Sequence, residues 1–428
     1  MLKGEEKASD LLLKIGYGIL LGGLVGAAIS IFRKLVIIFQ GKMKEVFGIF
    51  RMGFTNALLG LIFIGVLGLI VGIFTQKEKF IGGSGIPQVS GQIKNGLEMD
   101  WKRVFPLKFL GGLIGLSAGL TVGREGPSVQ MGASLGQGLA DIFKKDKEDK
   151  NLFISAGAAA GLAAAFNAPL SGIVFVLEEL NQKFEKYLFL ISAAAAISAD
   201  IIAGIFFGTR PVIDMGRLVS VEFYEYGYII ILALIIGVLS KYFIKGIYHV
   251  KRIYERVRLE TYLKVTFAFL LSGIVILIWP EMFGSGEEFI FLALGENVEI
   301  YRQIVILLAK FSLLLLAFCS GMPGGIFLPM LVLGALIGNI FGSCLLFFGM
   351  VNSDFVIVLS IIGMAANFSA IVRSPITAML LIIELTGAFT FFLPLVLGVL
   401  VSYVVIESIN IKAIYEILLE MLLEKNLG

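Results

Sequence analysis

The sequence contains few of the residues from which enzymes build metal and nucleophile sites. Its 428 residues include two cysteines, Cys319 and Cys344, and one histidine, His249. Two isolated cysteines exclude a disulfide framework or a cysteine metal cluster, and a single histidine excludes a two-histidine zinc motif. We therefore expect neither an enzyme nor a metal site.

Charge is also scarce. Charged residues make up 16% of the chain, whereas a soluble domain contains about a quarter. The net charge of +3 is too small to indicate a nucleic-acid partner. Apolar residues, in contrast, reach 58%, and 51 glycines favour helices that pack closely through small residues. This composition predicts an all-α polytopic membrane protein surrounded by a lipid bilayer.

The apolar stretches are long and are separated by short polar or Gly/Pro-rich interruptions. They cover residues 15–31, 54–74, 104–122, 156–177, 187–207, 226–243, 267–278, 304–318, 330–348, 355–372, 376–385 and 391–406. The longest basic run lies between Lys241 and Lys264, and the positive-inside bias predicts that this end is cytoplasmic. An amphipathic helix is expected at 411–425, on the cytoplasmic side.

One ionisable pair stands inside otherwise apolar sequence, in Gly123-Arg124-Glu125-Gly126-Pro127. Pro127 suits the first turn of a helix, and the two glycines allow backbone N–H groups to approach a bound group. Free N–H groups and the helix dipole then create an anion site, to which Glu125 adds its own carboxylate. The alternative is an ordinary Arg–Glu pair in a loop between two spans.

Two more Gly/Pro turns have the same character. They are Gly83-Ser84-Gly85-Ile86-Pro87 and Gly325-Ile326-Phe327-Leu328-Pro329. A helix broken at membrane depth is tolerated only where its freed N–H groups line a cavity or bind something. Helix N-termini that converge on one point favour a small anion.

The two halves of the chain repeat each other. In one register Lys108 matches Lys310 and Gly123 matches Gly325, and in a slightly shifted register Glu178 matches Glu384. Chance matching of small residues is the alternative. Repeated halves with broken helices at corresponding places indicate a transporter whose site lies between the halves. We expect one domain over 1–428, with a first repeat at about 12–208 and a second at about 223–408.

The three turns resemble the signature motifs of the CLC family of chloride channels and chloride/proton antiporters. The segment from Gly157 to Pro169 and Ser374-Pro375-Ile376-Thr377 resemble that family too. The likeness is to prokaryotic-type members without cytoplasmic regulatory domains. It implies a homodimer in which each subunit has its own pore and consists of two inverted repeats of tilted and broken helices.

The resemblance also implies roles for single residues. A central chloride would be held by two hydroxyls and two backbone N–H groups, those of Ser84, Tyr415, Ile326 and Phe327. The backbone along the anion path would be that of Gly83, Gly85, Arg124 and Gly126. Glu125 matches the gate that competes with the anion and accepts protons. Glu179 matches the internal glutamate through which antiporters pass protons to the cytoplasm.

Two of these assignments have plain alternatives: Glu179 as a helix-end carboxylate facing water, and Tyr415 as a surface tyrosine on an amphipathic helix. The predicted function is chloride/proton antiport across the cell (inner/plasma) membrane, with both termini cytoplasmic and no cofactor other than chloride ions in the pore. A passive chloride channel of the same fold differs only through Glu179. A fluoride/proton antiporter fits less well, because that branch departs from serine at the position of Ser84.

Overall fold

The computed structural model describes residues 2–213, 221–294 and 299–427, and within these it is helical, with two isolated bridges in place of a sheet. The α-helices are α1 (Leu2–Phe50), α2 (Phe54–Lys77), α3 (Ile86–Asn95), α4 (Trp101–Ser117), α5 (Glu125–Ile142), α6 (Lys147–Phe166), α7 (Pro169–Phe175), α8 (Lys186–Phe207), α9 (Tyr226–Arg256), α10 (Thr261–Ile278), α11 (Ile300–Cys319), α12 (Phe327–Phe347), α13 (Ser353–Val372), α14 (Pro375–Thr386), α15 (Phe392–Ser408) and α16 (Ile414–Leu427). The all-α prediction is confirmed.

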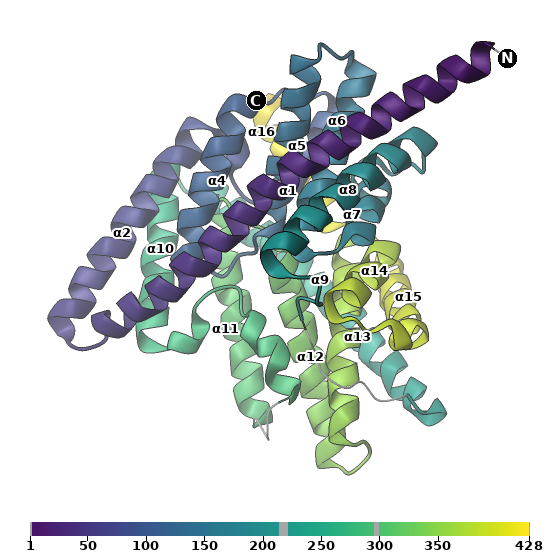
Figure 1. Ribbon diagram of the computed structural model, residues 1–428. Coiled ribbons are helices and arrows are strands. Elements are labelled where there is room, and N and C mark those ends of the chain that lie inside the picture. The colour runs from purple at the N-terminus through teal and green to yellow at the C-terminus, as the bar shows by residue number, and fades with distance from the viewer. Residues whose placement is uncertain (1, 214–220, 295–298, 428) are drawn as a thin grey trace.

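Within the described ranges, nine helices are long and apolar enough to cross a membrane. They differ in how far the protein itself covers them. The apolar window of α13 is 94% buried, whereas that of α2 is 28% buried. In Figure 1, α2 lies at the edge of the molecule and α1 runs diagonally across its front. The buried helices therefore form an interior in which polar groups can be kept away from lipid.

Several predicted stretches differ in extent from the helices. Residues 15–31 are only the middle of α1, which has 49 residues. The stretch 104–122 is helical only to Ser117, because Gly119 adopts a left-handed φ of 85°. Residues 156–177 divide at Asn167, whose φ is 52°, and Pro169 then opens α7. The divided segments are the ones that bring helix ends into the interior.

Close helix contacts depend on small residues, as the composition predicts. A Cβ atom added to Gly132 of α5 would lie 2.1 Å from the carbonyl oxygen of Gly157 in α6. At the matching positions of the second half, a Cβ on Gly334 would lie 2.4 Å from the carbonyl oxygen of Gly363. Any side chain at these contacts would push apart the helices that carry the interior turns.

Two buried lysines make matching contacts in the two halves. Lys108 Nζ donates to the carbonyl oxygens of Ile81 and Gly83 at 2.8 and 2.7 Å. Lys310 Nζ donates to those of Met282 and Gly284, both at 2.9 Å. These residues occupy matching places in the two sequence halves.

Two glutamates match in the same way. Glu178 accepts from the backbone N–H groups of Ile376 and Thr377 at the start of α14. Glu384 accepts from those of Leu170 and Ser171 at the start of α7. Each half thus caps a short helix of the other, as expected for repeated halves. The exact repeat boundaries stay a prediction.

Candidate functional site

The three Gly/Pro turns meet in the interior. Gly123 and Gly325 exchange two backbone hydrogen bonds, each of 2.7 Å between nitrogen and oxygen. The N–H of Gly83 donates to the carbonyl oxygen of Met322 at 3.1 Å, and the N–H of Gly324 donates to that of Gly83 at 3.1 Å. Three segments far apart in the sequence are thereby joined, and the helices that follow them, α3, α5 and α12, begin beside one another.

Ser84 occupies the first of these turns. Its neighbours Gly83 and Gly85 have φ values of 68° and 94°, which a residue with a Cβ rarely adopts. Ser84 is 2% exposed, and its hydroxyl has no hydrogen-bond partner among the described residues. A Cβ on Gly126 would lie 2.5 Å from this hydroxyl. The Ser84 hydroxyl and the Glu125–Gly126 backbone therefore line the same small space.

Glu125 is the first residue of α5 and is completely buried. Its carboxylate faces the backbone N–H groups of Glu125 itself and of Leu328, but neither oxygen forms a hydrogen bond of normal geometry within the described chain. The nearest cation is Arg124, with 3.9 Å between Nε and a Glu125 oxygen. Arg124 also lies 3.9 Å from Glu287, so it is shared between two carboxylates. A tight loop ion pair, the simple alternative, is not what forms here.

Ile326 and Phe327 stand at the start of α12, where backbone N–H groups have no partner within the helix. Both residues are fully buried. The Phe327 ring packs against the rings of Phe368 and Phe166, with centroid separations of 4.4 and 5.6 Å. This packing holds the N-terminus of α12 in place beside the other two turns.

Tyr415 comes from the far end of the chain, in the first turn of α16. It is 2% exposed, so it is not a surface residue. Its hydroxyl lies near Ser84, and the carboxylates of Glu179 and Glu125 both act on it electrostatically. No hydrogen bond of normal geometry satisfies this hydroxyl within the described residues. Two unpaired hydroxyls and an unpaired carboxylate thus share the interior.

The pair Glu178-Glu179 divides into two roles. Glu178 caps α14, accepting from the backbone N–H and the hydroxyl of Thr377 at 2.8 and 2.7 Å. Glu179 lies in a single π-helical turn and is 9% exposed. The Ser374 hydroxyl donates to its carboxylate at 2.9 Å, and Lys94 donates to its backbone carbonyl at 3.2 Å. Glu179 therefore does not simply face water.

Sequence reasoning missed three residues around the site. Lys108 holds the turn before Ser84, Ser374 holds the Glu179 carboxylate, and Lys94 lies against the Glu179 backbone. For Lys108 a signal existed, namely a lysine inside an apolar stretch that matches a second lysine in the repeat. Ser374 belongs to the Ser374-Pro375-Ile376-Thr377 segment that resembles the family, but nothing local indicates its contact with Glu179, and nothing local marks Lys94.

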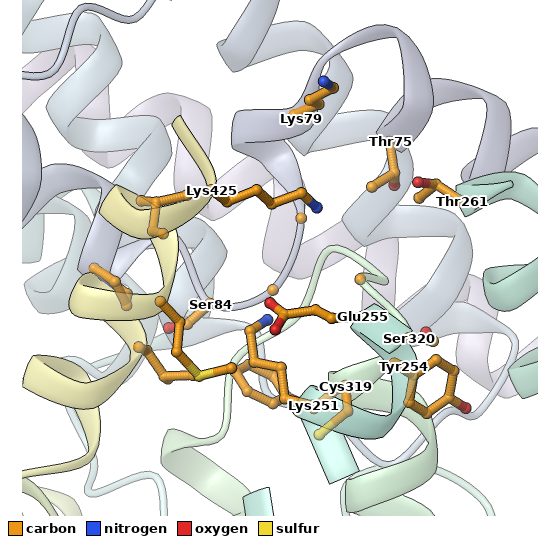
Figure 2. Close-up of a pocket in the computed structure, with 18 of the residues that line it drawn as sticks. Thr75, Lys79, Ser84, Lys251, Tyr254, Glu255, Thr261, Cys319, Ser320 and Lys425 are labelled. Atoms are coloured by element: carbon orange, nitrogen blue, oxygen red, sulfur yellow. The ribbon is translucent and has the colours of Figure 1, made fainter. Parts of the chain in front are cut away.

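A cavity of about 520 Å³ leads from Ser84 to the surface. Figure 2 shows its wall, to which α9, α16 and the turn before Ser84 contribute. The basic end of α9, predicted to be cytoplasmic, lies at its mouth. No group of three or more metal-ligating side chains occurs in the described part of the chain. The arrangement suits a small unhydrated anion, held by N–H and O–H groups and reached through a polar entrance.

Comparison with known proteins agrees with this geometry. A profile of the family described as "Voltage gated chloride channel" matches residues 67–407. The H(+)/Cl(-) exchange transporter ClcA of Salmonella agona (strain SL483) is 35% identical over 376 residues, which cover 85% of this chain and 78% of that protein.

Two solved structures are similar as well. A slow cyanobacterial Cl⁻/H⁺ antiporter superimposes with a TM-score of 0.90 at 29% identity, covering 97% of this chain and 99% of the other. A CLC-type fluoride/proton antiporter has a TM-score of 0.80 at 20% identity, with 96% and 98% covered. The second likeness concerns the fold alone.

Proposed function

Because the chain belongs to the voltage-gated chloride channel family, we propose that this multi-pass membrane protein exchanges chloride for protons. The observation that carries the proposal is the Glu125 carboxylate, buried and without a hydrogen bond, where the N-termini of α3, α5 and α12 meet. A carboxylate there occupies a position that stabilises negative charge. It competes with an anion when ionised and withdraws when protonated.

In this mechanism chloride is coordinated by the hydroxyls of Ser84 and Tyr415 and by backbone N–H groups of Ile326 and Phe327. Ionised Glu125 fills the anion position and blocks the path. Protonation removes its attraction to the helix N-termini, and chloride enters in its place. One residue is therefore both gate and proton carrier, so the movement of one ion requires the movement of the other.

Glu179 is the internal proton-transfer residue in this proposal. Its burial, the hydrogen bond from Ser374 and the electrostatic action of both Glu179 and Glu125 on Tyr415 support that role. A passive channel would need no buried carboxylate here. The likeness to exchangers in the comparisons also favours antiport over passive conduction. Ser84, with its small hydroxyl donor, favours chloride as the anion.

We also propose that the protein acts as a homodimer in the cell (inner/plasma) membrane, with one anion path in each subunit and both termini cytoplasmic. Large apolar side chains are well exposed on α8 and α15, for example Ile205 at 75% and Leu393 at 63%. A second copy and lipid would cover them. Crosslinking in membranes through single cysteines on α8 tests the dimer.

The test of the function is proton movement driven by a chloride gradient in liposomes containing only this protein. Uphill proton movement is expected, and chloride flux without it would refute exchange in favour of a channel. Glu125→Gln carries an uncharged side chain of the same shape. That variant should pass chloride without pH dependence and move no protons. Wild-type pH dependence in Glu125→Gln would remove Glu125 from the mechanism.

A further inference from the structure

The cavity beside Ser84, through which chloride would pass, has a basic wall to whose lysines the exchange mechanism assigns no role. Five cationic residues and two carboxylates line it, and they come from the turn before Ser84, α9, α10 and α16. The cations are Lys79, Lys251, Arg252, Lys264 and Lys425, and the carboxylates are Glu255 and Glu424. The cavity therefore carries a clear excess of positive charge beside the anion path.

Both carboxylates are already engaged by one cation. Arg252 lies 2.7 Å from Glu424 and 3.6 Å from Glu255, measured from its guanidinium nitrogens to their oxygens. The four lysines form no ion pair among the described residues. Arg252 thus ties α16 to α9, and the lysines are left with only the longer-range attraction of carboxylates such as Glu255.

The lysines are also close enough to repel one another. Lys425 acts electrostatically on both Lys251 and Lys264. In Figure 2 the side chains of Lys251, Glu255 and Lys425 extend from α9 and α16 into the cavity. Lys251 is half-buried, with its ammonium 5.8 Å from the centre of the Phe318 ring. Like charges held together in a partly enclosed space are costly unless a counter-charge joins them.

A single chloride ion would neutralise only one of these lysines, whereas a chain of phosphates presents several negative charges at once. The volume of about 520 Å³ lies inside the range of ordinary ligand pockets. Lysine ammonium groups bind phosphate oxygens as point charges without demanding one geometry. The wall therefore suits a linear polyvalent phosphate better than it suits chloride.

We propose that this cavity binds a phosphate-bearing polyvalent anion and that the bound anion blocks chloride passage. Binding depends only on the lysines. The block rests on the proposed function, because Gly83 and Ser84 form the inner end of the cavity, and an occupant there stands between the surface and the chloride site. A nucleoside triphosphate and inorganic polyphosphate share the required chemistry.

The first experiment measures binding alone. Purified protein in detergent is titrated with sodium triphosphate, ATP or inorganic phosphate in magnesium-free buffer. Triphosphate should bind, and raising the salt concentration should weaken its binding. The double variant Lys251→Met/Lys425→Met should raise its dissociation constant at least ~10-fold, since each charged hydrogen bond lost is worth that much. Lys245→Met, on the exposed face of α9 and outside the cavity, is the matched control.

The outcomes separate cleanly. Equal dissociation constants for ATP and triphosphate would support recognition of the phosphate chain. A much lower dissociation constant for ATP would identify a nucleotide as the ligand. The proposal would be overturned if inorganic phosphate bound as tightly as triphosphate. It would also be overturned if Lys245→Met and the double variant lost the same affinity for triphosphate. If the double variant does not fold, Lys425→Met alone decides, because Lys425 is exposed near the end of α16.

The second experiment measures chloride efflux from liposomes with triphosphate on both sides of the membrane. Flux should fall in wild type and in Lys245→Met, and the double variant should need at least ~10-fold more triphosphate for half-block, relative to its own unblocked flux. Chloride flux that triphosphate never reduces would refute the block. Absence of any chloride flux would refute the proposed function instead, and the binding titration would still test the site.

Discussion

Lys108 and Lys310 allow the turn that carries Ser84 to be tested against an internal control. Replacing Lys108 by Met removes both of its hydrogen bonds and strands the carbonyl oxygen of Ile81 in the interior, whereas that of Gly83 keeps the hydrogen bond from the Gly324 N–H. A stranded buried carbonyl costs about 1–3 kcal/mol. Lys310→Met strands the carbonyl oxygen of Met282 in the same way, while that of Gly284 keeps the hydrogen bond from the Thr121 hydroxyl. Both variants should therefore lose similar thermal stability in detergent.

Their effects on chloride should differ. Of the two lysines, only Lys108 forms a hydrogen bond with Gly83, the residue before Ser84. If that hydroxyl leaves its place, one hydrogen bond to a charged ligand is lost, and chloride affinity should fall ~10-fold or more. Isothermal titration with chloride measures this. Lys310→Met should retain wild-type affinity within about twofold, a tolerance set by the spread of such measurements. Equal chloride affinity in the two variants would refute the idea that Lys108 positions Ser84.

Three other substitutions test single steps. Glu179→Gln should abolish proton movement while chloride flux persists, and unchanged proton-to-chloride coupling in liposomes would exclude Glu179. Ser84→Pro should weaken discrimination between chloride and nitrate, because one hydroxyl donor is lost; equal flux ratios before and after would reduce Ser84 to a turn residue. Ser374→Ala removes the hydrogen bond to Glu179, which should make proton transport slower than chloride transport, and a rescue by Ser374→Thr would separate that bond from packing.

The features that could be predicted from the sequence depend on residue types that have a single structural role in their local context. Pro127 and Pro329, each just inside a helix start, were enough to locate two of the interior turns. A lysine inside an apolar segment is costly and therefore uncommon, so the match of Lys108 with Lys310 indicated a repeat. Pro169 likewise accounts for the division of residues 156–177, because proline cannot continue a helix and instead opens α7.

Other features depend on contacts that no local pattern reveals. Nothing near Tyr415 marks it as an interior residue; its burial results from the way α16 returns to the start of α3. Glu178 and Glu179 are adjacent and identical in type, yet one caps α14 and the other lies buried against Ser374. Successive side chains of a helix point in different directions, here within one π-helical turn, so the neighbours that each glutamate meets decide its role. The basic wall of the cavity likewise combines lysines from four distant segments.

The position of α16 explains how one helix can keep two ion paths apart. Tyr415, at its start, lies near Ser84, and the carboxylates of Glu179 and Glu125 both act on it electrostatically. One and two turns later, Leu418 and Met421 line the cavity that leads away from Ser84, whereas Glu416 acts electrostatically on Glu179. In the proposed mechanism chloride therefore leaves along one side of α16 and protons along the other. In this mechanism the two paths share only Glu125, and exchange requires that they share nothing else. If chloride could reach Glu179, or if water connected the two paths, either ion could pass without the other.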